Sequence, residues 1–122
     1  MVAIKAYTDL SQSKTLGKIL PLESADMYYF RQIDNDYFPP NVESICPIPL
    51  FKDGKEDFNY DIRCWSLAAL LGVLPNPSLH QTKDGKWYCT AEPNRIHFSG
   101  QYNNPVDACV AMIEKLHELN LL

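Results

Sequence analysis

The side chains best suited to covalent chemistry lie between residues 80 and 99. Cys89 or Ser99 could act as a nucleophile, with His80 or His97 as the base. A nucleophile needs a base within hydrogen-bond reach. Pairing of the strands that carry Cys89 and His97 would bring these two together, so a small hydrolase using Cys89 with His97 is one alternative. No nucleophile signature of a known enzyme class surrounds them, which favours a buried cysteine and a surface histidine.

The cysteines show no metal-binding pattern. The chain has four, none of them in a C-x-x-C pair: Cys46, Cys64, Cys89 and Cys109. Zinc sites require closely spaced cysteine and histidine ligands. Free cysteines otherwise behave as small buried hydrophobes. We therefore expect them in the core, and the sequence predicts no metal site, no cofactor and no catalytic residue.

Charge and hydropathy exclude several classes of function. The net charge is −4 and no basic stripe exists, which argues against binding to nucleic acid through phosphate contacts. The glycines are scattered, so no phosphate-binding loop is present. No apolar run approaches the roughly 18 residues needed to span a bilayer. The N-terminus lacks the apolar core of a secretory signal, and we expect a cytoplasmic protein without membrane contact.

Aromatic residues supply the stronger candidates for binding. Tyr, Trp and Arg dominate the energetics of binding surfaces. Tyr28 with Arg31, and Tyr88 with Arg95 and His97, could present stacking and charge-assisted contacts on a sheet face or its rim. These five residues form the predicted site for a ligand or partner. The alternative is that the aromatic side chains only cover a small core.

Three helices are expected to support these residues. The first, over 9–20, begins with the capping box of Asp9 and Gln12. The second, over 66–74, is apolar on all sides, which predicts burial on several sides at the centre of the core. The third, over 104–120, begins with the cap Asn104 followed by a proline at the first helical position. Its apolar stripe has helical spacing: Val106, Cys109, Val110, Ile113, Leu116 and Leu119.

Strands fill the intervals between these helices. The stretch 25–32 reads as a strand, and 44–51 is at most an edge strand because it carries two prolines. Residues 79–82 and 87–91 flank a Lys-Asp-Gly-Lys turn and predict a β-hairpin; residues 96–98 would add a strand. The sequence thus predicts an α+β fold, a small antiparallel sheet packed by about three helices. We expect one domain over 1–122 with a loop-rich insertion around 32–63.

Three segments resemble small hypothetical proteins of gut Bacteroidales and their phages. They are Leu20-Pro21-Leu22-Glu23-Ser24-Ala25-Asp26-Met27, the run from Cys64 to Pro75 (CWSLAALLGVLP), and Asn104-Pro105-Val106-Asp107-Ala108. More loosely, the chain is similar to the phage α/β/α-sandwich domain. The resemblance implies an origin in a phage or mobile element and an antiparallel sheet flanked by helices. It implies no activity, and it carries over no functional residue.

These observations favour a non-catalytic binding protein of a phage or mobile element. Its target would be a host protein or a small, nucleotide-like signalling molecule, in an anti-defence role. A small structural or virion-assembly protein is the alternative beside the hydrolase. We also expect a homodimer, because two-fold pairs are the commonest small assemblies.

Overall fold

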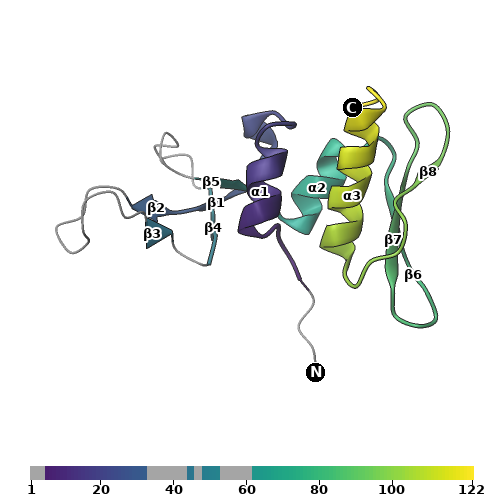
Figure 1. The fold of residues 1–122 in the computed structure, drawn as a ribbon, viewed down its shortest axis with the longest axis horizontal. Coiled ribbons are helices and arrows are strands. Elements are labelled where there is room, and N and C mark those ends of the chain that lie inside the picture. Colours follow the sequence, from purple (N-terminus) through teal and green to yellow (C-terminus); the bar gives the residue numbers. More distant parts are fainter. Residues whose placement is uncertain (1–4, 33–43, 46–47, 53–61) are drawn as a thin grey trace. The chain divides into compact units, whose positions relative to one another are not determined.

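The computed structural model describes residues 5–32, 44–45, 48–52 and 62–122 (Figure 1). The described elements are helices and small antiparallel sheets, as expected for an α+β fold. The contacts divide the chain into two compact units. The N-terminal unit is Asp9–Trp65, and the C-terminal unit combines Met1–Thr8 with Ser66–Leu122. Most of the predicted insertion at 32–63 lies outside the described residues.

The N-terminal unit begins with helix α1 (Leu10–Leu16). The predicted capping box is confirmed, because Asp9 Oδ1 accepts the Gln12 N–H at 2.8 Å and Gln12 Oε1 accepts the Asp9 N–H at 3.1 Å. The helix ends at Leu16, earlier than the predicted residue 20. Gly17 is its C-cap, and single-turn hydrogen bonds carry the backbone onward to Leu20.

A three-stranded antiparallel sheet follows, in the order β4-β1-β5. Its strands are β1 (Met27–Tyr29), β4 (Leu50–Phe51) and β5 (Ile62–Cys64). A separate pair joins β2 (Arg31–Gln32) to β3 (Ser44–Ile45), and a short 3-10 helix η1 (Leu22–Ser24) precedes β1. The predicted strand 25–32 is therefore divided into β1 and β2. The predicted edge strand 44–51 is divided into β3 and β4, and β4 lies at an edge of its sheet. Strand β5 was not predicted.

The core of the N-terminal unit lies where α1 meets β5. Its fully buried side chains include Leu16, Cys64 and Trp65. The indole Nε1–H of Trp65 donates to Ser24 Oγ at 2.9 Å. A buried indole donor is costly unless it is paired, so this bond fixes the orientation of the ring at the end of β5.

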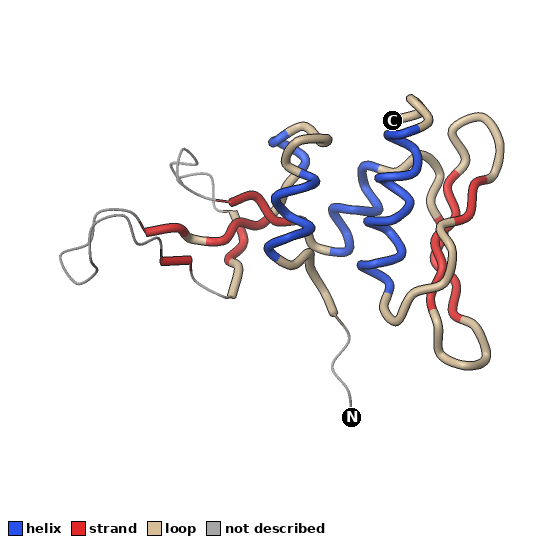
Figure 2. Tube along the Cα trace, viewed as in Figure 1, coloured by secondary structure: helices blue, strands red, loops and turns tan. Residues whose placement is uncertain are grey.

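The C-terminal unit has the order α2 (Leu67–Val73), β6 (Ser78–Gln81), β7 (Trp87–Ala91), β8 (His97–Phe98) and α3 (Pro105–Glu118). The three strands form one antiparallel sheet with β7 at its centre. Helix α3 contacts both β7 and α2. In Figures 1 and 2 both helices therefore lie on one side of the sheet, with α3 next to the strands.

The hairpin and the α3 cap are confirmed in detail. Ser78 pairs with Thr90, and Gln81 pairs with Trp87. Gly85 in the turn has a φ of 85°, a backbone conformation that favours glycine. The side chain of Asn104 accepts the Asp107 N–H at 2.9 Å. Asp107 in the first turn also bonds Lys5 at 3.0 Å.

The prediction that the second helix is buried on several sides is wrong. Ser66 caps α2, but Leu70 is its only buried residue, and Ala68 and Gly72 are exposed. A seven-residue helix offers a single contact face, and α3 takes the position against the sheet.

Helix α3 forms the centre of this core instead. It buries eight residues, more than the predicted stripe: Pro105, Val106, Ala108, Cys109, Val110, Met112, Ile113 and Leu116. Leu119, which the stripe included, is the C-cap and is 49% exposed. The helix ends before the predicted residue 120, and Asn120 has a positive φ of 56°.

Candidate functional site

The two faces of the β6–β7–β8 sheet differ in what covers them. Side chains alternate between the faces along each strand. On the face toward α3, Cys89 and Ala91 are buried, and so is His97, which pairs with Ala91. The opposite face, which we call the outer face, consists of Ser78, His80, Tyr88, Thr90, Ile96 and Phe98.

Aromatic rings cross the outer face from strand to strand. His80 and Tyr88 are paired across β6 and β7, and their rings stack with centroids 4.7 Å apart and planes inclined by 16°. Tyr88 also lies 6.3 Å from the ring of Phe98 on β8, at 37°. The three rings form one row, which adds a fixed geometry to the apolar area.

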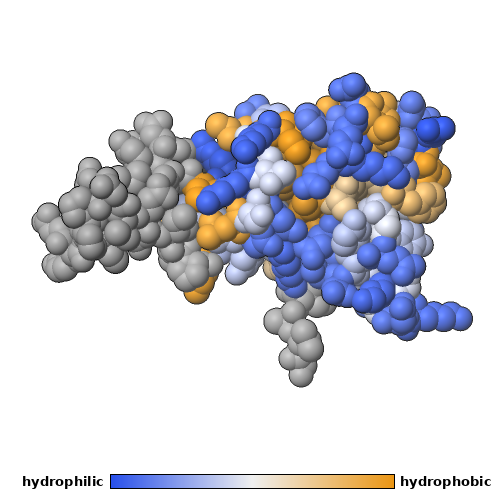
Figure 3. All heavy atoms as spheres, in the orientation of Figure 1, coloured by the Kyte–Doolittle hydropathy of each residue, from blue (hydrophilic) through white to orange (hydrophobic). Residues whose placement is uncertain are grey.

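The β8 end of the outer face is the most apolar. Ile96 and Phe98 are each 57% exposed, and Figure 3 shows hydrophobic atoms at the surface near β8. Tyr88 and Thr90 are half-buried, and Ser78 and His80 are exposed. Within the described part of the C-terminal unit no element covers this face, so its rings can contact another molecule.

A β-bulge follows β8 at the end of the outer face. Ser99 N–H donates to Cys89 O at 2.9 Å, and Trp87 forms a bridge with Tyr102. Two residues, Gly100 and Gln101, therefore stand opposite one residue of β7, which is the definition of a β-bulge. Gly100 has a φ of 90°, a conformation that side chains rarely adopt.

The five predicted site residues fall in different places. Tyr28 lies in β1 of the N-terminal unit, is half-buried, and pairs with Leu50 and Arg63. The backbone of Arg31 lies in β2, and its side chain is outside the described residues. Tyr88, Arg95 and His97 belong to the C-terminal unit, so the structure gives no single cluster of all five.

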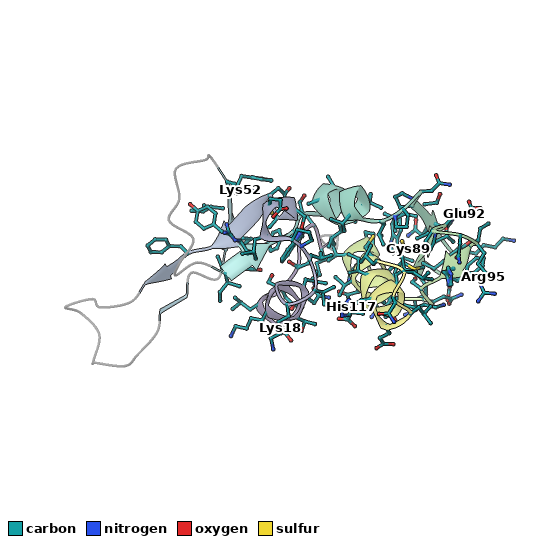
Figure 4. The ribbon with its side chains drawn as sticks, turned by 90° about the horizontal axis from the view of Figure 1, so that it is seen from above. Lys18, Lys52, Cys89, Glu92, Arg95 and His117 are labelled. Atoms are coloured by element: carbon teal, nitrogen blue, oxygen red, sulfur yellow. The ribbon has the colours of Figure 1, made fainter. Side chains whose placement is uncertain are left out.

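Within the C-terminal unit only part of the predicted group shares a surface. Tyr88 is on the outer face, and Arg95 is exposed in the turn between β7 and β8. Figure 4 shows Arg95 and Glu92 pointing away from the helices and Cys89 lying between the sheet and α3. His97 is on the covered face and only 7% exposed, so it cannot take part in a contact on the outer face. Its Nε2 has no hydrogen-bond partner among the described residues.

Sequence reasoning missed His80 and Phe98 as members of the surface row. The signal was present, because a hairpin closed by the turn at 83–86 fixes His80 opposite Tyr88. Alternation along β8 then places Phe98 on that face. The histidine had been considered only as a base, and the phenylalanine only as a strand residue.

The Cys89 thiol is buried beside a second thiol. Cys89 and Cys109 both have no exposed surface, and Cys89 Sγ donates to Thr90 O at 3.6 Å. A hydrogen bond between the two thiols lowers the pKa of Cys89. The same bond, together with burial, raises the pKa of Cys109 well above its usual range. A substrate would have no access to either sulfur, and this geometry gives the hydrolase alternative no support.

Among the residues that the structure describes, no three potential metal ligands of the His, Cys, Asp or Glu type gather in one place. In that same part of the chain no helix combines the length and the apolarity needed to cross a bilayer. Comparison with protein-family models, with curated protein sequences and with solved structures finds no match to this chain.

Proposed function

We propose that this chain is a non-catalytic binding protein that contacts a partner protein through the outer face of β6–β7–β8. The observation that carries the proposal is the exposure of Phe98 and Ile96, each 57%, beside the stacked rings of His80 and Tyr88. Exposed apolar patches on small domains commonly mark interaction sites. Aromatic anchors with fixed geometry are typical of the energetic centres of interfaces.

A protein is a better partner for this face than a small molecule. Sites for small molecules are concave and enclose most of their ligand. The outer face is the open side of a sheet, with its rings standing across three strands. The exposed Arg95 at its end can form polar contacts at the rim of such an interface.

The resemblance to small proteins of Bacteroidales phages supports a host protein as the partner. The proposed role is to block a host protein, as an anti-defence factor would, in the cytoplasm. Cys89 and Cys109 are free and buried, which suits a reducing compartment because disulfides are rare there.

The test compares three baits in a lysate of a Bacteroidales host. They are the unchanged chain, Phe98→Ser, and the control Leu122→Ser, which removes a leucine that is 42% exposed outside the outer face. The unchanged chain and the control should enrich the same host protein. Phe98→Ser should recover about tenfold less of it, the equivalent of one lost anchor contact. Thermal melting establishes that all three baits are folded.

Two results would count against the proposal. Equal recovery by Phe98→Ser and the control would move the contact away from the outer face. If the unchanged chain enriches no host protein, the proposal of a host partner fails.

A further inference from the structure

The free edge of the C-terminal sheet has a hydrogen-bonding pattern that can be read from the central strand. The N–H of Trp87 donates to Tyr102 O at 2.7 Å, and Cys89 O accepts the Ser99 N–H at 2.9 Å. Trp87 and Cys89 therefore direct their backbone groups toward β8. In an antiparallel sheet alternate residues bond to opposite sides, so Tyr88 directs its groups toward β6. The Thr82 N–H to Lys86 O bond, 2.8 Å, continues this pattern.

The same alternation decides which groups of β6 are left open. Leu79 pairs with Cys89 and Gln81 pairs with Trp87. Because those two partners bond toward β8, Leu79 and Gln81 direct their own N–H and C=O groups away from β7. Among the strands that the structure describes, the sheet ends at β6, so these donors and acceptors lie along its free edge.

The two edges of the sheet differ in their protection against pairing. At β8 the outward carbonyl of Phe98 accepts Lys115 Nζ at 2.8 Å, the strand is only two residues long, and the Gly100 bulge follows it. Lysines, short strands and bulges are the usual features that keep an edge from pairing. Strand β6 is Ser-Leu-His-Gln, with three of its four residues exposed. Pro77 and Lys83 flank it, but the outward groups of Leu79 and Gln81 lie between them, with no bulge and, among the described residues, no lysine bonded to their carbonyls.

From this asymmetry we propose that β6 pairs with β6 of a second copy of this chain. The strands run antiparallel about a two-fold axis through His80, and the two three-stranded sheets become one of six strands. Leu79 of each copy pairs with Gln81 of the other, so every outward N–H meets a C=O. The strand contains no Asp, Glu, Lys or Arg, so no like charges of these residue types face each other in this register. This inference does not depend on what the outer face binds.

Charges at the ends of β6 favour a second copy over an unrelated strand. In this register Thr82 of one copy stands opposite Ser78 of the other, and Lys83, the first residue of the turn, follows Thr82. Lys83 therefore lies toward the end of β6 where the other copy carries Glu92, whose carboxylate accepts Asn76 Nδ2 at 3.3 Å. Opposite charges near these ends favour this register. Symmetry repeats the arrangement at the other end. Lys83 is exposed.

The decisive variant is Gln81→Pro in the full chain, compared with Gln81→Ala. Proline removes the outward N–H and obstructs the approaching strand, while β6–β7 pairing does not use that N–H. Alanine keeps the N–H. Sedimentation equilibrium should show a monomer–dimer equilibrium for the unchanged chain, a similar one for Gln81→Ala, and dissociation about tenfold easier for Gln81→Pro. Gln81→Lys, which adds an edge lysine without restricting the backbone, should weaken the dimer as well.

Two further measurements report on the geometry of the pairing. Amide hydrogen exchange at Leu79 and Gln81 should be slow at high protein concentration and become fast on dilution. Lys83→Glu and Glu92→Lys should each weaken the dimer, and their combination should restore it. A chain that stays monomeric up to about 1 mM overturns the proposal. So does a dimer that neither Gln81→Pro nor Gln81→Lys weakens, or one with no protection at Leu79 and Gln81.

Discussion

The imidazole of His80 stacks on the phenol ring of Tyr88 across the β6–β7 pair, with centroids 4.7 Å apart. The two residues are direct partners in the ladder, so the stack follows from the hairpin register. It fixes both rings on the side of the sheet that α3 does not cover. Tyr88 then extends the row to Phe98, and the outer face gains an ordered aromatic surface.

A double-mutant cycle measures this stack. His80→Ala and Tyr88→Ala should each lower the free energy of unfolding, and the double variant should lose less than the sum. The expected coupling is about 0.5–1 kcal/mol, typical of aromatic pairs across strands. Urea unfolding of the four proteins gives the value, and strict additivity would show that the rings do not interact.

Replacing His97 tests whether that residue serves the core or the surface. Its Nε2 is buried without a partner in the described part of the chain, and a buried unsatisfied polar atom costs about 1–3 kcal/mol. His97→Leu should therefore unfold at the same or a higher urea concentration and keep partner binding unchanged. Loss of binding with unchanged stability would instead restore the histidine to the binding site.

Alkaline titration probes the thiol pair. The hydrogen bond to Cys89 and burial raise the pKa of Cys109 above the 9.0 of a free thiol. A raised pKa contributes stability that is fully present below pH 9 and is lost as the pH rises above it, because the unfolded thiol ionises first. The free energy of unfolding should fall above pH 9, and Cys109→Ala should lower that slope. An identical slope in the variant would contradict the raised pKa.

Two glycines should respond to alanine in opposite directions. Gly72 is exposed in α2, and nothing lies within 4 Å of an added Cβ. Gly72→Ala should stabilise the chain by about 0.5–1 kcal/mol through helix propensity. Gly100 has a φ of 90° in the bulge after β8, so Gly100→Ala should destabilise by about 1 kcal/mol or more. Thermal unfolding of the pair checks both signs.

Local cues predicted the parts of the fold that depend on neighbouring residues. Asp9 with Gln12, Asn104 with the following proline, and the Lys-Asp-Gly-Lys turn at 83–86 each act over a few positions. The structure confirms the contacts that they imply. The ends of helices were predicted less well, because α1 ends at Leu16 with Gly17 as its C-cap and α3 ends at Glu118 with Leu119 as its C-cap, before the predicted residues 20 and 120.

Properties that depend on distant contacts were not predicted. The burial of α2 was inferred from composition alone, but α3 occupies the position against the sheet. Strand β5 has only three residues, too few for a periodic pattern, and its pairing with β1 is long-range. Among the site candidates, Tyr88 was correctly placed on a strand, whereas assigning His97 to the opposite face required the β7–β8 register.

The central claim, that the outer face of β6–β7–β8 contacts a partner protein, is tested most directly by photo-crosslinking. The photoreactive p-benzoylphenylalanine is placed at position 98 or, as a control, at position 122, and each protein is irradiated in host lysate. A specific adduct with one host protein from position 98, absent from position 122, is the predicted result. An adduct from position 122 alone, or none from position 98, would contradict the claim.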